Sequence, residues 1–133
     1  MSTDPIYLDS SALLKLVFEA EETPRLVEFL SEWPARVSSA LARIEVMRIA
    51  ARLEDRAVAR EAQRIFRGIS LVRIDDGIVA AAAAIKPAGL RSLDAIHLAT
   101  VHAFGHHLGG MVVYDRRLAR AARDQGIVVW APA

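Results

Sequence analysis

Short apolar runs alternate with longer amphipathic segments along the chain. The runs are rich in β-branched and other large apolar residues, which is typical of buried strands. They predict strands at Ile6–Leu8, Arg36–Ser38, Leu71–Ile74, Met111–Tyr114 and Ile127–Trp130. The segments between them are rich in alanine and arginine and have helical character. They predict helices at about Ser11–Val17, Thr23–Leu30, Ala40–Leu53, Ala57–Arg67, Asp75–Ile85, Ser92–Phe104 and Arg116–Asp124.

Several boundaries between these elements have local chemical support. Serine hydroxyls are good helix N-caps, and glycine suits the end of a helix or the turn after it. The serines at such positions are Ser11, Ser39 and Ser92, and the glycines are Gly68, Gly105 and Gly126. Short apolar strands separated by helices favour a parallel sheet, since parallel pairing needs crossover connections. The pattern therefore predicts an α/β fold, with a mostly parallel sheet covered by helices on both faces.

Length and composition limit the class of protein. A chain of 133 residues suits one compact domain, which we expect to span residues 1–133. With 53% hydrophobic residues and a mean hydropathy of +0.25 the chain is unusually apolar, so we expect a homodimer or a permanent partner. The net charge of +1 provides no global basic field for nucleic acid, so any phosphate recognition must be local.

The expected compartment rests on features that the sequence lacks. No apolar run approaches the roughly 18 residues of a membrane span, because the richest, Gly77–Ile85, is followed by Lys86 and Pro87. The first residues include Asp4 and no basic cluster, unlike a signal peptide. We therefore expect a cytoplasmic protein with no membrane attachment. The absence of cysteine is compatible with that location and excludes thiol catalysis and zinc–thiolate sites.

Acidic residues follow two of the predicted strands. Asp9 comes after the first strand and Asp115 after the fourth. Asp94 lies in the first turn of a predicted helix, and Glu45 lies on a narrow polar stripe of an otherwise apolar helix. In an open parallel sheet, ligands bind beyond the carboxyl ends of the strands. Taken singly, each acid also has an ordinary explanation, such as a turn, a helix-dipole contact or a surface pair of Glu45 with Arg48.

Four converging carboxylates would indicate a metal site. Two carboxylates about 4 Å apart repel by roughly 4 kcal/mol at an effective dielectric constant of about 20, so several cannot stay ionised together without a cation. An all-oxygen acidic site suits Mg²⁺ or Mn²⁺. These ions favour phosphate chemistry, because they neutralise a phosphoryl oxygen and lower the pKa of a bound water. The enzyme hypothesis that follows is metal-assisted hydrolysis of a phosphodiester.

Four segments resemble the acidic motifs of PIN-domain ribonucleases, in the same order and at the same spacing. They are IYLDSSALLKL, SSALARIEVMRIA, SLDAIHLAT and VYDRRLARAAR. The nearest resemblance is to VapC toxins of type II toxin–antitoxin systems, and it covers the chain from Ile6 to Trp130. It implies a three-layer α/β/α fold with about five strands. In that fold the strand before Asp9 neighbours the strand before Asp115, where the strand order reverses.

The same resemblance implies a site, an activity and a partner. Asp9, Glu45, Asp94 and Asp115 would bind Mg²⁺ or Mn²⁺ directly or through water, and Ser11 would support the first acid. The implied activity is endonucleolytic cleavage of RNA by a metal-activated water. A cognate VapB-like antitoxin would restrain it.

One position departs from the family pattern. The last motif commonly has Thr or Ser two residues before its Asp, where this chain has Val113. A hydroxyl that could bond to the acidic cluster is absent, so the alternative is a non-catalytic PIN-like module that binds RNA or a protein. A phosphoacceptor domain of the receiver type is a third candidate. It needs a lysine near the last strand, and the chain has none after Lys86.

Basic, histidine and apolar residues supply further candidates. Arg116, Arg120 and Arg123 recur at i, i+4 and i+7, where they could contact RNA phosphates, pair with an antitoxin or simply be solvated. His97 is more typical of a packed or hydrogen-bonded histidine than of a catalytic one. The segment Thr23–Leu30, with the Trp-Pro pair that follows it, could form a groove for an amphipathic partner helix or pack in the core.

Overall fold

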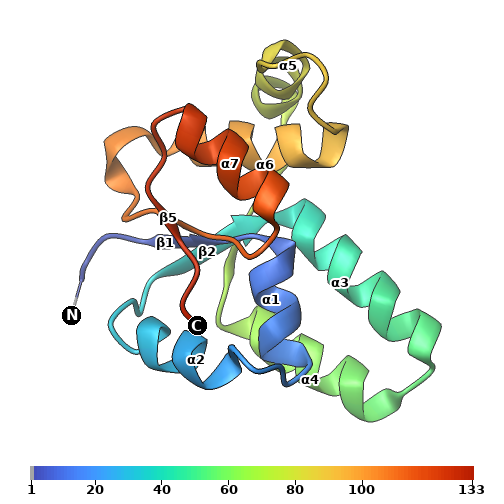
Figure 1. The fold of residues 1–133 in the computed structure, drawn as a ribbon. Coiled ribbons are helices and arrows are strands. Elements are labelled where there is room, and N and C mark those ends of the chain that lie inside the picture. Colours follow the sequence, from blue (N-terminus) through green and yellow to red (C-terminus); the bar gives the residue numbers. More distant parts are fainter. Residues whose placement is uncertain (1) are drawn as a thin grey trace.

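The computed structural model describes residues 2–133 and contains a central sheet with helices on both faces (Figure 1). The strands are β1 (Ile6–Leu8), β2 (Arg36–Ser39), β3 (Ser70–Val72), β4 (Met111–Val112) and β5 (Val129–Trp130). The helices are α1 (Ser10–Val17), α2 (Thr23–Leu30), α3 (Ala40–Leu53), α4 (Arg56–Arg67), α5 (Asp76–Ala84), α6 (Ser92–Ala103) and α7 (Arg116–Asp124), with a 3₁₀ turn, η1 (Gly105–His107). The predicted α/β class is confirmed.

All strand pairs of the sheet are parallel, and the order is β3-β2-β1-β4-β5. The order reverses between β1 and β4, which pair with Tyr7 beside Met111 and Leu8 beside Val112. Because both strands point the same way, their carboxyl ends open at the same edge of the sheet. The predicted neighbourhood of the first and fourth strands is therefore confirmed.

Successive side chains of β1 point to opposite faces of the sheet and pack in two separate apolar clusters. Ile6 and Leu8 pack with residues of α1 to α4, whereas Tyr7 packs with residues of α6 and α7. Figure 1 accordingly has α1, α2, α3 and α4 on one side of the sheet and α6 and α7 on the other, with α5 beyond α6. The three-layer architecture implied by the resemblance is confirmed.

Several predicted boundaries differ by one or two residues; for example, β3 ends at Val72 rather than Ile74, and β5 begins at Val129 rather than Ile127. Three of the differences concern elements that carry or precede an acid of the candidate site. The fourth strand was expected to reach Tyr114 but ends at Val112, because the Tyr114 backbone N–H donates to the Ser11 hydroxyl instead of a strand carbonyl. Helix α1 begins at Ser10, and its cap is Asp9 rather than Ser11. Helix α6 includes Ser92 as its first residue and has no side-chain cap.

Helix α2 packs one face in the core and exposes the other. Leu26 and Leu30 are buried in the cluster beneath the sheet, as the packing alternative predicted. Val27 is exposed and borders a cavity of about 270 Å³ between α2 and α4. The apolar groove proposed for this segment is therefore confined to a small hollow beside Val27. Within residues 2–133, no helix combines the length and the apolar character needed to cross a membrane.

Candidate active site

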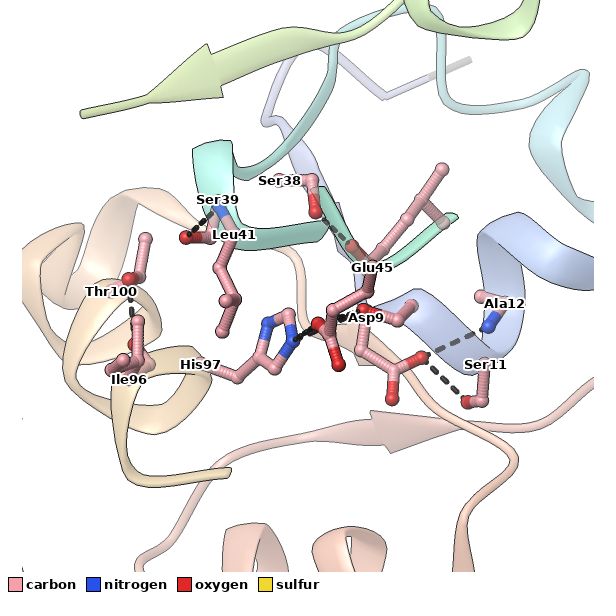
Figure 2. Close-up of polar contacts among 12 residues, drawn as sticks. Asp9, Ser11, Ala12, Ser38, Ser39, Leu41, Glu45, Ile96, His97 and Thr100 are labelled. Atoms are coloured by element: carbon pink, nitrogen blue, oxygen red, sulfur yellow. Dashed lines mark hydrogen bonds and ion pairs between the residues drawn. The ribbon is translucent and has the colours of Figure 1, made fainter. Parts of the chain in front are cut away.

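Asp9 is the most buried acid of the candidate site, with 3% of its surface exposed. It follows β1, and its Oδ1 accepts hydrogen bonds from the Ser11 hydroxyl (2.6 Å) and the Ala12 backbone N–H (3.0 Å; Figure 2). Burial raises the pKa of Asp9 to about 6, against the lowering effect of these two hydrogen bonds. The negative charge of Asp115 raises it further. The hydrogen bonds that the protein donates to Asp9 therefore do not fully offset the cost of ionising this buried carboxyl group.

Ser11 links the carboxyl ends of the two neighbouring strands β1 and β4 through its hydrogen bonds. Its hydroxyl donates to Asp9 and accepts the Tyr114 backbone N–H at 2.9 Å. One side chain on α1 thereby holds the residue after β1 and the residue before Asp115 at a common edge. The contact between Ser11 and Asp9 agrees with the role that the family resemblance implies for this serine.

Glu45 projects from α3 toward the same edge and is half-buried (Figure 2). Its Oε1 accepts from the Ser10 hydroxyl and lies 3.1 Å from His97 Nε2. Burial acts to raise the pKa of Glu45, but the hydrogen bonds from His97 and Ser10 outweigh it and keep the pKa below its ordinary value. The surface pair with Arg48 is therefore not the environment of Glu45.

His97 lies on α6 and is buried, with 3% of its surface exposed. Its Nδ1 lies 2.7 Å from the Tyr7 hydroxyl, and its Nε2 lies 3.3 Å from the Ser10 hydroxyl in addition to the Glu45 contact. The prediction of a packed, hydrogen-bonded histidine is confirmed. Sequence reasoning missed Tyr7 and Ser10 as its partners, because nothing local pairs residues so far apart along the chain.

Asp94 and Asp115 complete the predicted set of acids. Asp94 is half-buried in the first turn of α6, and its pKa is raised by burial and then by the charge of Asp115. Asp115 is exposed and caps α7 by accepting the Leu118 backbone N–H at 2.9 Å. The charge of Glu45 also raises the pKa of Asp94. These mutual effects mean that the acids lie close enough to repel one another.

The acids fit a hard divalent cation by their chemistry and charge. All their donors are carboxylate oxygens, which suit Mg²⁺ or Mn²⁺, and a cation would relieve both the repulsion and the cost of ionising buried Asp9. Within residues 2–133, however, no three His, Asp or Glu side chains already stand in an arrangement that could hold an ion. The donor set is therefore suitable, while the side chains do not yet enclose a cation.

A basic cavity of about 370 Å³ borders the site on the Asp94 side. Its lining includes Arg91 from the loop before α6 and Arg117 and Arg120 from α7. Of the predicted arginines, Arg120 lines this cavity, whereas Arg116 and Arg123 are exposed elsewhere on α7. Arg117 and Arg120 are three residues apart, a spacing that places both side chains on neighbouring positions of the helix surface that lines the cavity.

Val113 fills space rather than leaving a gap where the family commonly has a hydroxyl. Its side chain is fully buried and packs in the apolar cluster with Tyr7 and Leu98. The Ser11 hydroxyl, which lies between the exits of β1 and β4, supplies a polar group to the Tyr114 backbone nearby.

The parallel sheet, whose strand order reverses between β1 and β4, carries acids at the carboxyl ends of its strands, as in a PIN domain. The PIN domain family model matches residues 6–124 of the chain. Ribonuclease VapC46 of Mycobacterium tuberculosis is 44% identical over 129 residues, covering 96% of this chain and 98% of that protein. Ribonuclease VapC47 of the same species is 35% identical over 131 residues, covering 96% of each. The chain belongs to the VapC ribonucleases of the PIN-domain family.

Solved structures agree on the fold. One is a toxin–antitoxin complex from Klebsiella pneumoniae, with a TM-score of 0.71 and 20% identity, covering 96% of this chain and 98% of that one. Another is Mycobacterium tuberculosis VapC20, described as a sarcin–ricin loop cleaving toxin. It has a TM-score of 0.73 and 16% identity, covering 96% of this chain and 99% of that one. At this identity the likeness extends to the fold alone.

Proposed function

We propose that this protein is a Mg²⁺-dependent endoribonuclease toxin that hydrolyses RNA phosphodiester bonds and is neutralised by a cognate antitoxin. The observation that carries the proposal is the buried, incompletely compensated carboxylate of Asp9, with Asp115 close enough for its charge to raise the pKa of both Asp9 and Asp94. Such a cluster is stable in its ionised form only with a cation. The ribonuclease relatives support RNA as the substrate.

Asp9, Glu45, Asp94 and Asp115 would hold Mg²⁺ or Mn²⁺. When bound, such an ion lowers the pKa of water and neutralises charge on a phosphoryl oxygen. The protein's own contribution is orientation. Ser11 holds Asp9 at the end of β1, and contacts with the Ser10 hydroxyl and His97 hold Glu45. Asp115 is exposed, which leaves that side of the cluster open to a large substrate.

The basic cavity beside Asp94 is proposed as the phosphate contact of the RNA. Within residues 2–133, none of Arg91, Arg117 and Arg120 is held in an ion pair, so their guanidinium groups are available to an anion. The sequence predicted phosphate contacts at Arg116, Arg120 and Arg123. The set proposed from the cavity shares only Arg120 with that prediction and adds Arg91 and Arg117.

Replacing Arg117 and Arg120 together by Gln is expected to lower the affinity for RNA and to make that affinity less sensitive to salt. For single-stranded RNA each lost phosphate contact should reduce the slope of log K against log salt by about 0.7. Fluorescence anisotropy in EDTA measures this without cleavage. The control replaces Arg56 and Arg60, which are exposed on α4, on the opposite side of the sheet (Figure 1). An equal slope for the two double variants would remove the cavity from the proposal.

An antitoxin of the VapB type is the proposed partner, and the similar fold of the toxin–antitoxin complex from Klebsiella pneumoniae supports it. The product of a short open reading frame just upstream should co-purify with the protein, and failure to form a complex would remove that partner. Homodimerisation and a cytoplasmic location remain predictions of the sequence.

Incubating the purified, antitoxin-free protein with structured RNA tests the activity. We expect cleavage with Mg²⁺ or Mn²⁺ and none with EDTA, because the ionised acids need a cation. Cleavage that persists in EDTA would refute the metal mechanism. RNA binding without cleavage of any RNA, by a correctly folded protein, would favour the non-catalytic binding module, for which Val113 is the motivating departure.

A further inference from the structure

Three side chains form a continuous series of polar contacts through the interior, from Tyr7 on β1 to the acid Glu45 of the candidate site. The Tyr7 hydroxyl contacts His97 Nδ1 at 2.7 Å, and His97 Nε2 contacts Glu45 Oε1 at 3.1 Å. Tyr7 is fully buried and His97 is 3% exposed, so water does not compete for these contacts. The three residues come from β1, α6 and α3, and the rings of Tyr7 and His97 meet edge to face, with centroids 5.9 Å apart.

The direction of each hydrogen bond follows from the chemistry of the two ends. A carboxylate oxygen can only accept, and Glu45 Oε1 lies 3.1 Å from His97 Nε2. His97 Nε2 must therefore carry a hydrogen. At the other end, the Tyr7 hydroxyl has one O–H hydrogen to donate and lies 2.7 Å from His97 Nδ1. His97 Nδ1 is then the acceptor, and the ring is held as its Nε2–H tautomer.

The two oxygens of Glu45 consequently differ. Oε1 receives both the Ser10 hydroxyl and His97 Nε2–H. Among the described residues, no group hydrogen-bonds Oε2. One oxygen is thus committed to the protein, and the other remains free for a ligand.

We propose that His97 is a positioning residue that fixes the Glu45 carboxylate through its Nε2–H tautomer, with Tyr7 holding the ring, so that Oε2 is presented to a divalent cation. This inference rests on the proposed function in naming the cation. Groups that orient a metal-binding side chain typically change metal affinity by about 10–100-fold when removed.

Metal affinity in the absence of RNA tests the proposal. By isothermal titration with Mn²⁺, His97→Leu should bind roughly 10–100-fold more weakly than the natural protein. His97→Gln can donate an amide hydrogen from a similar place and should recover most of that loss. Thr100→Val is the matched control: Thr100 is a buried polar residue on α6, and among the described residues its hydroxyl donates a hydrogen bond only to the Ile96 carbonyl (2.7 Å; Figure 2). It should leave the affinity unchanged.

Nitrogen-15 spectra of the histidine side chains test the tautomer separately. For the metal-free protein at neutral pH we expect the His97 signals of a ring with hydrogen on Nε2 alone. A ring with hydrogen on Nδ1 alone, or on both nitrogens, would overturn the assigned direction of the hydrogen bonds. The Tyr7→Phe variant should shift the Nδ1 signal, because its hydrogen bond is lost.

The outcomes separate this inference from the proposed function. Mn²⁺ affinity that depends on His97 in a protein that cuts no RNA would retain the positioning role and refute the nuclease. Equal affinity of a folded His97→Leu variant and the natural protein would overturn the positioning role whatever the nuclease activity. No Mn²⁺ binding by the folded natural protein would overturn both.

Discussion

Asp94→Asn is expected to reduce RNA cleavage by about 10²–10³-fold, the usual effect of losing one group that stabilises charge in a reaction. Asp94 is half-buried beside the basic cavity, and its carboxylate interacts with the charges of Asp115 and Glu45. The substitution keeps the shape of the side chain but removes its charge, so an ion loses a strong donor. Single-turnover cleavage of a labelled RNA at saturating Mg²⁺ measures the change.

Asp124→Asn is the matched control for that experiment. Asp124 is also an acid lining the cavity, but it lies at the end of α7 rather than at the start of α6. We expect its rate to stay close to that of the natural protein. Comparable losses in the two variants would mean that cleavage depends on the charge of the cavity and not on a cation held by Asp94.

Asp9→Asn is expected to abolish cleavage while stabilising the metal-free protein at neutral pH. The folded pKa of Asp9 is about 6, above its unfolded value of 3.8. For a carboxyl raised in this way, the contribution to stability is fully present below pH 3.8 and is lost as the pH rises through 6. At pH 7 the ionised group costs at most about 3 kcal/mol, which Asn avoids. An asparagine N–H₂ group without a hydrogen-bond partner would cost about 1–3 kcal/mol and so reduce the stabilisation by that amount.

Urea unfolding in EDTA between pH 4 and 7 measures the effect. The natural protein should lose stability over this range relative to Asp9→Asn. Asp55→Asn is the control, because Asp55 caps α4 in the same way but is exposed. Asparagine caps a helix about as well as aspartate, so neither variant should lose its helix. Identical pH profiles for Asp9→Asn and the natural protein would contradict the burial of an ionised Asp9.

Addition of Mg²⁺ should reverse the order of stability between the two proteins. A ligand that binds only the folded state stabilises it in proportion to its affinity, and the natural Asp9 carboxylate is the stronger donor. This coupling connects the stability experiment to the proposed site.

Much of the fold was predictable because its signals are local. Apolar runs and helical periodicity placed all five strands and all seven α-helices, and the order of the acidic motifs indicated the family. One of the boundary errors occurs where a side chain from a distant segment intervenes. Strand β4 ends early because the Tyr114 backbone N–H is bonded by Ser11, a residue more than a hundred positions earlier in the chain.

The site was predictable only in part, for the same reason. Asp9 and Asp115 could be located, because each follows an apolar run. His97 could be described as packed, but its partners Tyr7 and Glu45 are separated from it by 90 and 52 positions. No periodicity in the sequence indicates which helix face will meet which strand at that separation.

The sequence by itself determined the alternation of strands and helices and the types of residue at the ends of the strands, since both depend on neighbouring residues. Only the tertiary structure decided which carboxylate is buried and which is exposed. It raised the pKa of Asp9 by desolvation, left Asp115 open to solvent and placed His97 between Tyr7 and Glu45. The physical reason is that burial and the choice of hydrogen-bond partner are set by contacts between segments distant in the chain.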